Sequence, residues 1–99
     1  MIHEVLHPGR ENAQTGRELS TLLRLPIREL TQLIEAERRQ GYPICASTGI
    51  NPGYFLAADQ DEMQAYCNSL LRRAGEIHKT RRACLKTLAT LPLNTDNNQ

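Results

Sequence analysis

Two histidines near the start of the chain have the spacing of a zinc-protease motif. The segment His3-Glu4-Val5-Leu6-His7 matches H-E-x-x-H, in which two histidines one helical turn apart ligate zinc and the glutamate is the general base. Pro8-Gly9 would end the helix directly after the motif, and its extended form needs glycine and histidine where the chain has Arg10 and Ala13. We therefore expect a polar first helix, no enzyme and no cofactor. A zinc hydrolase with these two histidines as ligands is the remote alternative.

A second group of polar side chains has the residue types that read base edges in DNA. Arginine donates two hydrogen bonds to guanine, glutamine pairs with adenine, and threonine bonds a phosphate or touches a thymine methyl group. Such residues occupy the outward positions of a 3.6-residue period over residues 27–40, namely Arg28, Thr31, Gln32, Glu35 and Arg38. The alternative is an ordinary solvated helix face, and carboxylates on it weaken attraction to phosphates.

Three helices are predicted in the first part of the chain, and they must position these side chains. Residues 2–7 form a short one, with Ile2, Val5 and Leu6 on one face. The segment Thr15-Gly16-Arg17-Glu18 has the pattern of a capping box and begins the second, whose apolar stripe is Leu19, Leu22 and Leu23. Pro26 then begins a helix over 27–40, in which Ile27, Leu30, Leu33, Ile34 and Glu37 follow the inward period.

A β-hairpin and a long helix are predicted to follow. Residues 43–47 and 53–56 are short β-compatible runs, and Pro52-Gly53 would fill the centre of a type II turn between them. An acidic cap at Asp59 begins a helix that extends from about residue 61 to about residue 90. The polar residues after Pro92 are expected to be disordered.

The order of these elements, and the residues at three places, resemble the winged helix-turn-helix family. Residues 17–20, 25–30 and 33–34 resemble its helix-turn-helix core, and residues 37–44 resemble the exit from the recognition helix into the wing. Gly53-Tyr54-Phe55-Leu56 resembles the G-Y-x-L second wing strand. The same order occurs in the N-terminal domain of the biotin repressor and in small bacterial and prophage regulators. The resemblance covers residues 15–58 and indicates a type of domain, without a target sequence.

This resemblance implies a fold, a partner and a set of contacts. The fold class is mainly α with a small β-hairpin, a winged helix-turn-helix followed by a long C-terminal helix. The recognition helix 27–40 would enter the major groove of double-stranded DNA with its outward side chains at the base edges. Arg17 would meet a phosphate at the start of the preceding helix. The wing 43–56 would offer Ser47, Thr48 and Asn51 to the backbone or the minor groove.

Apolar residues recur every seven positions along the predicted C-terminal helix. They follow the a/d pattern of a coiled coil, with d at Met63 and a at Cys67, and Arg81 interrupts the pattern at an a position. We expect the first part of this stripe to pack on the winged domain and the second part to form the seam of a homodimer. The predicted seam consists of Met63, Cys67, Leu70, Ala74, Ile77, Cys84 and Leu88.

Charge is distributed unevenly along a nearly neutral chain. The 99 residues carry twelve Lys+Arg and eleven Asp+Glu, a formal net charge of +1. A nucleic-acid-binding protein more often has a pI above ~9, so DNA contact here would depend on a local patch. Residues 72–86 hold six basic side chains against one acidic, and Arg72 and Arg73 among them are possible phosphate contacts. The alternative is a solvated helix face whose cations favour the helix dipole.

Composition excludes several other classes. No apolar run is long enough for a transmembrane helix, and no secretory signal is visible at the N-terminus. Aromatic residues make up 4% of the chain, too few for an RNA-stacking surface. The three cysteines form no C-x-x-C pair, which indicates small core residues in a reducing cytoplasm and not a disulfide scaffold or a metal site.

The sequence thus predicts three segments and one leading function. Residues 1–58 form the winged helix-turn-helix domain, 59–91 a long helix for packing and dimerisation, and 92–99 a disordered tail. We expect a cytoplasmic, homodimeric transcriptional regulator of bacterial or prophage type that binds double-stranded DNA. No membrane association or small-molecule substrate is expected. The main alternative is that the same fold is a protein-interaction module in replication or recombination.

Overall fold

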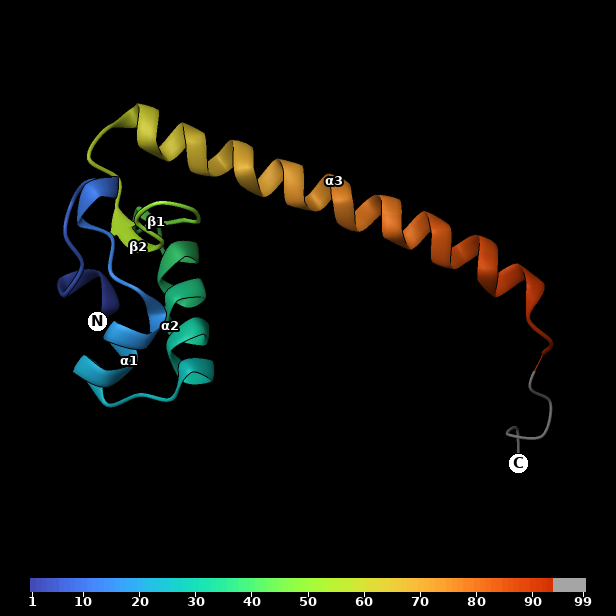
Figure 1. Cartoon of the computed structure of the whole chain (residues 1–99), viewed down its shortest axis with the longest axis horizontal. Helices are drawn as coiled ribbons and strands as arrows, with labels where there is room; N and C mark the ends of the chain where they lie inside the picture. Colours follow the sequence, from blue (N-terminus) through green and yellow to red (C-terminus); the bar gives the residue numbers. More distant parts are fainter. Residues whose placement is uncertain (94–99) are drawn as a thin grey trace. The chain divides into compact units, whose positions relative to one another are not determined.

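The computed structural model describes residues 1–93 and confirms the predicted mainly helical fold with a small hairpin and a long C-terminal helix (Figure 1). The elements are two 3-10 turns, η1 (Ile2–Glu4) and η2 (Arg10–Asn12), the helices α1 (Gly16–Leu23) and α2 (Ile27–Arg39), the strands β1 (Ile44–Ser47) and β2 (Gly53–Leu56), and the helix α3 (Gln60–Thr90). The chain divides into two compact units, Met1–Asn68 and a second that begins at Ser69.

The division falls inside α3, whereas the sequence placed a boundary at residue 58. The first turns of α3 therefore belong to the same compact unit as the helices and the hairpin. Of the predicted tail 92–99, Pro92 and Leu93 have no regular structure, and residues 94–99 lie outside the described part of the chain.

Local sequence rules account for the two helices at the centre of the first unit. The predicted capping box is present: the Thr15 hydroxyl accepts from the Glu18 amide at 3.0 Å, and the Glu18 carboxylate accepts from the Thr15 amide at 3.2 Å. Arg24 ends α1 in the left-handed region with φ of 55°, and Pro26 precedes α2 with φ of −58°. Three residues thus separate the two helices.

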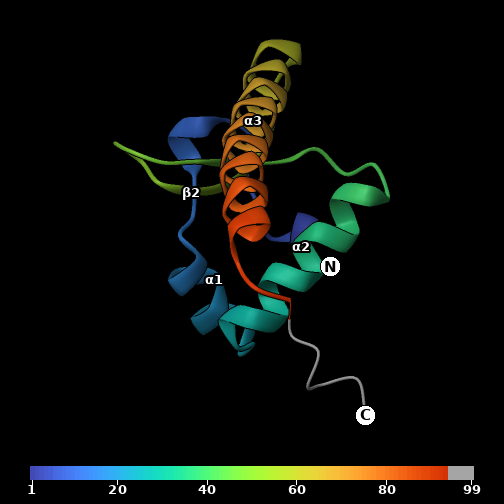
Figure 2. The ribbon, with the colours of Figure 1, turned by 90° about the vertical axis from the view of Figure 1, so that its right-hand side faces the viewer.

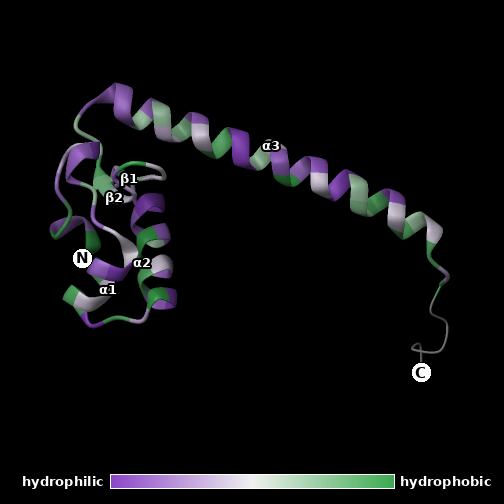
Figure 3. Cartoon of the chain, viewed as in Figure 1, coloured by the Kyte–Doolittle hydropathy of each residue, from purple (hydrophilic) through white to green (hydrophobic). Residues whose placement is uncertain are grey.

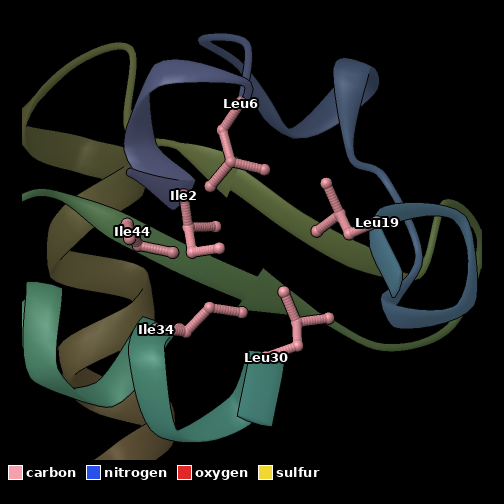
Figure 4. Packing of buried hydrophobic residues seen from close by; sticks show 6 residues of the cluster. All are labelled: Ile2, Leu6, Leu19, Leu30, Ile34 and Ile44. Atoms are coloured by element: carbon pink, nitrogen blue, oxygen red, sulfur yellow. The ribbon is translucent and has the colours of Figure 1, made fainter. Parts of the chain in front are cut away.

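A cluster of six buried side chains holds this unit together. Leu30 and Ile34 lie one turn apart on α2 and point toward Leu19 of α1, Ile44 of β1, and Ile2 and Leu6 of the N-terminal segment (Figure 4). The predicted inward period of α1 and α2 is confirmed at these core positions. Leu22 and Ile27, which the sequence assigned to the same apolar stripes, are 60% and 52% exposed.

The N-terminal segment holds two 3-10 turns and two isolated bridges to β2, and the predicted helix over residues 2–7 is wrong beyond its first turn. Only Ile2–Glu4 is helical, as a 3-10 turn. The His7 carbonyl accepts from the Leu56 amide at 2.9 Å, and the Gly9 amide donates to the Leu56 carbonyl at 2.9 Å. Gln14 and Tyr54 exchange two further backbone hydrogen bonds. These backbone groups would form helical hydrogen bonds if the helix continued. Because β2 satisfies them instead, pairing with the strand replaces the predicted helix.

The other edge of β2 pairs with β1, and the connection between these two strands is longer than predicted. β1 and β2 are antiparallel, with Cys45 opposite Phe55 and Ser47 opposite Gly53. Gly53 is thus the first residue of β2, and the predicted turn centred on Pro52-Gly53 is wrong. The chain reverses over residues 48–52, where Gly49 and Asn51 have positive φ values, and this loop extends beyond the helices of the first unit (Figure 2).

The first turns of α3 cover the hairpin through a second buried cluster. Tyr66 packs with Cys45 and Phe55, and the half-buried Met63 packs against them. Asp59 caps the helix as predicted, because its carboxylate accepts from the Glu62 amide at 2.9 Å. The expectation that the first part of the heptad stripe packs on the preceding domain is confirmed at Met63.

The three cysteines have different environments. Cys45 is a small core residue as predicted, and burial raises the pKa of its thiol to about 11. Cys67 and Cys84 are exposed, so their prediction as core residues is wrong within one chain. Among the helices of residues 1–93, none has a stretch both long and apolar enough to span a membrane.

Gly53 yields a prediction about stability. Its φ is +135°, and a Cβ atom there would collide with the backbone carbonyl of Gln14. We expect Gly53→Ala to lower the free energy of unfolding by about 1–3 kcal/mol. Urea denaturation followed by circular dichroism measures this change. The matched control is Gly75→Ala, where a Cβ has open space inside α3 and should stabilise the helix by about 0.5–1 kcal/mol. Equal stability of Gly53→Ala and wild type would contradict the close approach.

Candidate nucleic-acid interface

The outward face of α2 is open to solvent along its whole length. Arg28, Thr31, Gln32 and Glu35 are exposed, on the side of the helix opposite the buried Leu30 and Ile34. The side chains of Arg28 and Gln32 make no hydrogen bond or ion pair with any residue of 1–93. Both therefore keep their full donor sets for another molecule.

Thr31 is more restricted than its exposure suggests. Its hydroxyl donates to the Ile27 carbonyl one turn back, at 2.9 Å. The hydroxyl proton is thus already in use, and a phosphate oxygen can only accept. Of the two contacts predicted for Thr31, the one to a thymine methyl group needs no bond to be broken.

Arg38 does not belong to this face, and its predicted outward orientation is wrong. Its side chain is 19% exposed, and its Nε donates to the Ile44 carbonyl of β1 at 2.9 Å. Its guanidinium lies 4.8 Å from the centroid of the Tyr66 ring and 5.9 Å from that of Tyr54. Arg38 therefore connects α2 to the hairpin and to the start of α3. The sequence placed Arg38 outside because the side chain is polar. The two tyrosines that it contacts are distant in sequence, so no local pattern indicated its inward position.

Arg39 was not among the DNA contacts predicted from the sequence. It is exposed, and it follows Arg28 by eleven residues, which is close to three helical turns. Arg28, Gln32, Glu35 and Arg39 therefore share one face of α2, with a cation at each end.

The predicted contacts outside α2 are divided between free and occupied groups. Arg17 is exposed in the first turn of α1, and Thr48 and Asn51 are exposed in the hairpin loop. Ser47 is half-buried, and its hydroxyl donates to the Asn51 carbonyl at 2.8 Å, so it closes the loop. The Thr48 carbonyl accepts from Nη2 of Arg10 at 3.4 Å. Arg10 thus adds a cation beside the loop that the sequence analysis did not assign.

A buried carboxylate stands behind the exposed face. The Glu37 side chain is 7% exposed, and it accepts from the backbone amides of Ile2 and His3 at 2.8 and 2.9 Å. Nδ1 of His3 lies 2.6 Å from the same carboxylate, and the His3 ring stacks on Tyr42 with centroids 3.6 Å apart. Burial by itself raises the pKa of this carboxyl, but the amides of His3 and Ile2 outweigh it, and the pKa falls from 4.5 to about 2.

The H-E-x-x-H pattern does not form the geometry of a zinc site. The 3-10 turn ends at Glu4, so His3 and His7 are not on one helical face, and the His3 ring is engaged by Glu37. Within residues 1–93, no three His, Cys, Asp or Glu side chains are grouped closely enough to hold a metal ion. His3 of the motif instead helps to anchor the N-terminal segment through its contacts with Glu37.

The second unit carries the remaining predicted contacts. Arg72 and Arg73 are exposed on α3. Past the first turns of the helix, the predicted seam residues are exposed as well, with Ile77 at 68% and Leu88 at 64%. Lys79 and Glu76 form an exposed ion pair at 3.0 Å, which contributes little stability.

Comparisons with known proteins add no assignment to these surfaces. No family model, no curated protein sequence and no solved structure matches the chain.

The Glu37 cluster generates a prediction about stability and pH. Glu37→Gln replaces an acceptor by a donor that faces two backbone amides, and we expect it to lower the free energy of unfolding by about 1–3 kcal/mol at neutral pH. Because the folded-state pKa is below the ordinary value, the carboxylate stabilises the wild type fully above about pH 4.5. This contribution is lost as the pH falls toward 2, so the two proteins should converge there.

Urea denaturation between pH 2.5 and 7 measures this difference. The matched control is Glu35→Gln on the exposed side of the same helix, where the carboxylate is 53% exposed. We expect the control to change the unfolding free energy by less than about 0.5 kcal/mol. A Glu37→Gln protein as stable as wild type at pH 7 would show that the carboxylate does not anchor the segment.

Proposed function

We propose that the protein binds double-stranded DNA with α2 in the major groove. The observation that carries this proposal is the open face of α2, on which Arg28, Gln32 and Arg39 are exposed. Arginine and glutamine are the side chains that make bidentate contacts with guanine and adenine. The helix follows a short turn from α1 and precedes a hairpin, which is the order of a winged helix-turn-helix.

The start of α2 supports the same orientation toward DNA. Pro26 gives the helix no side-chain cap, so its first backbone amides have no side chain as partner. A phosphate would satisfy these amides and interact favourably with the helix dipole. Arg17 at the start of α1 and Arg24 in the turn before α2 are also exposed, and both provide cations for the backbone.

The charge of the face limits the strength of binding. Glu29 and Glu35 are exposed beside the arginines, and each carboxylate repels a phosphate. The net charge of +1 provides no general attraction. Affinity in this proposal comes from a few placed contacts, which favours a sequence-selective regulator over a general DNA-coating protein. A homodimer would present two recognition helices to successive major grooves, about 34 Å apart.

The proposal extends to the biological role and the compartment of the protein. A transcriptional regulator of bacterial or prophage type in the cytoplasm is consistent with three unpaired cysteines, which persist in a reducing compartment.

A protein partner is the second candidate for the first unit. The observation that favours it is exposed apolar surface near the helix-turn-helix, with Leu22 and Ile27 more than half exposed. A replication or recombination accessory protein would use such side chains. The experiment below distinguishes the two candidates, because this alternative predicts a folded protein without affinity for duplex DNA.

Fluorescence anisotropy with labelled duplex fragments tests the proposal. We expect binding at 50 mM salt and a loss of affinity of about a hundredfold at 200 mM if four phosphates are neutralised. Arg28→Ala should weaken binding to the preferred fragment by about 5- to 150-fold and reduce the preference among fragments. Arg72→Ala is the comparison on α3, and it should weaken all fragments alike if Arg72 meets a phosphate.

Two controls make the outcome clear. Arg28 is exposed and has no partner within residues 1–93, so its removal should leave the unfolding free energy unchanged. Circular dichroism must show that each variant is folded before it is titrated. Absence of binding to every fragment at 50 mM salt, by folded wild-type protein, would overturn the proposal.

A further inference from the structure

The second unit has a continuous apolar face that nothing within residues 1–93 covers. Figure 3 shows hydrophobic and hydrophilic residues alternating along α3. The large apolar side chains of residues 70–91 are all exposed, namely Leu70 (42%), Leu71 (74%), Ile77 (68%), Leu85 (44%), Leu88 (64%) and Leu91 (59%). At 100° per residue they gather on one side of the helix, together with Ala74 and Cys84. A single solvated helix of this composition is marginally stable without a partner.

The face is wider than the seam of a parallel two-stranded coil. With d at Met63 and a at Cys67, Leu71 and Leu85 occupy e positions, beside the a/d stripe. In a parallel pair, e residues lie next to g residues of the partner, which include Arg73 and Thr80. In an antiparallel pair, e residues lie next to e residues. Leu71 of one copy would then meet Leu85 of the other.

Arg81 gives a second reason for the antiparallel orientation. In a parallel pair in register, an a residue faces the same a residue, so two Arg81 guanidinium groups would meet in the seam. Like charges held together out of water are strongly unfavourable. In an antiparallel pair, a residues face d residues, and Arg81 can face Ile77. The arginine stem then packs on the isoleucine while the guanidinium reaches solvent.

One antiparallel register pairs the seam positions from Cys67 to Leu91. When Arg81 faces Ile77, Leu88 faces Leu70, Cys84 faces Ala74 and Leu91 faces Cys67. Each large side chain of the outer layers thus meets a large or medium one, and the small Ala74 meets Cys84. The basic residues Arg72, Lys79, Arg82 and Lys86 project from the opposite side of each helix, so the pairing leaves them in solvent where salt screens them.

The available surface approaches what a stable pair requires. Fully burying a leucine or isoleucine removes about 60–120 Å² of apolar surface from water, so the six exposed side chains supply about 200–400 Å² per helix. A standard interface buries about 800 Å² per partner, of which about 450–500 Å² is apolar. Ala74, Cys67, Cys84 and the stem of Arg81 lie on the same face and add to this area.

We propose that α3 pairs with α3 of a second copy in antiparallel orientation, with Arg81 of each helix facing Ile77 of the other. This inference depends only on α3 and the residue that follows it, and it does not require the chain to bind DNA. Its test therefore contains no DNA, and its failure would leave the proposed function to be judged separately.

Sedimentation equilibrium of the full chain under reducing conditions measures the assembly. We expect a dimer that dissociates at least tenfold more readily in Ile77→Asp and Leu88→Asp. Lys79→Asp is the matched control, because it reverses a charge on the opposite side of the helix, and it should leave the dimer intact. A monomer at all concentrations, a trimer or tetramer, or equal effects of the three substitutions would overturn the proposal.

Cysteine cross-linking fixes the orientation and does not depend on the aspartate variants being folded. In the proposed register Cys84 faces Ala74, so Ala74→Cys in a Cys67→Ser background should form a covalent dimer on mild oxidation. Tryptic peptides 74–79 and 83–86 should be joined to each other. The Cys67→Ser protein with Ala74 intact should remain uncross-linked. A Cys84–Cys84 link in that control is the parallel result, and it would contradict the antiparallel pair.

Discussion

Two neighbouring charged residues near the end of α2 hold the first unit in its arrangement. Glu37 accepts hydrogen bonds from the backbone of the N-terminal segment, and Arg38 donates to β1 and lies over the ring of Tyr66. They point in different directions because adjacent residues are 100° apart on a helix. One anchors the segment that pairs with β2, and the other anchors the hairpin and the start of α3. Removing either side chain would leave buried backbone groups without hydrogen-bond partners, which is costly. The two contacts therefore favour one arrangement of the first unit.

This anchoring explains why the outward face of α2 is free. The inner side of the helix is occupied by apolar contacts and its last turns by the two charged anchors. What remains toward solvent is a row of long polar side chains on a helix that cannot easily shift. Binding then needs no rearrangement of the helix backbone, and the entropic cost is confined to ordering the free side chains. The near-zero net charge gives little attraction that is independent of the placed contacts.

The sequence predicted those features that depend on local rules. The capping box at Thr15, the break at Pro26, the buried positions of α2 and the long α3 all follow from residue types and spacing within one element. The errors concern contacts between distant parts of the chain. Gly53 pairs with Ser47 at the start of β2, and the backbone of Gln14 takes the space that a Cβ would need. The N-terminal helix stops because β2 pairs with residues 7–9, and Arg38 packs inward on Tyr66. The exposed positions on the outward face of α2 follow from the helical period, whereas the anchoring role of Glu37 and His3 had no pattern within a single element.

Chemical-shift mapping by NMR tests the central claim most directly. In the ¹⁵N-labelled full chain titrated with a short preferred DNA duplex, the signals that change should be those of Arg28, Gln32 and Arg39, with those of residues 48–51 in the hairpin loop. The amides of Ile2 and His3, which are bonded to Glu37 behind the face, should not change. Binding that leaves α2 unperturbed, or that shifts only residues 70–91 of α3, would contradict a recognition role for the open face of α2.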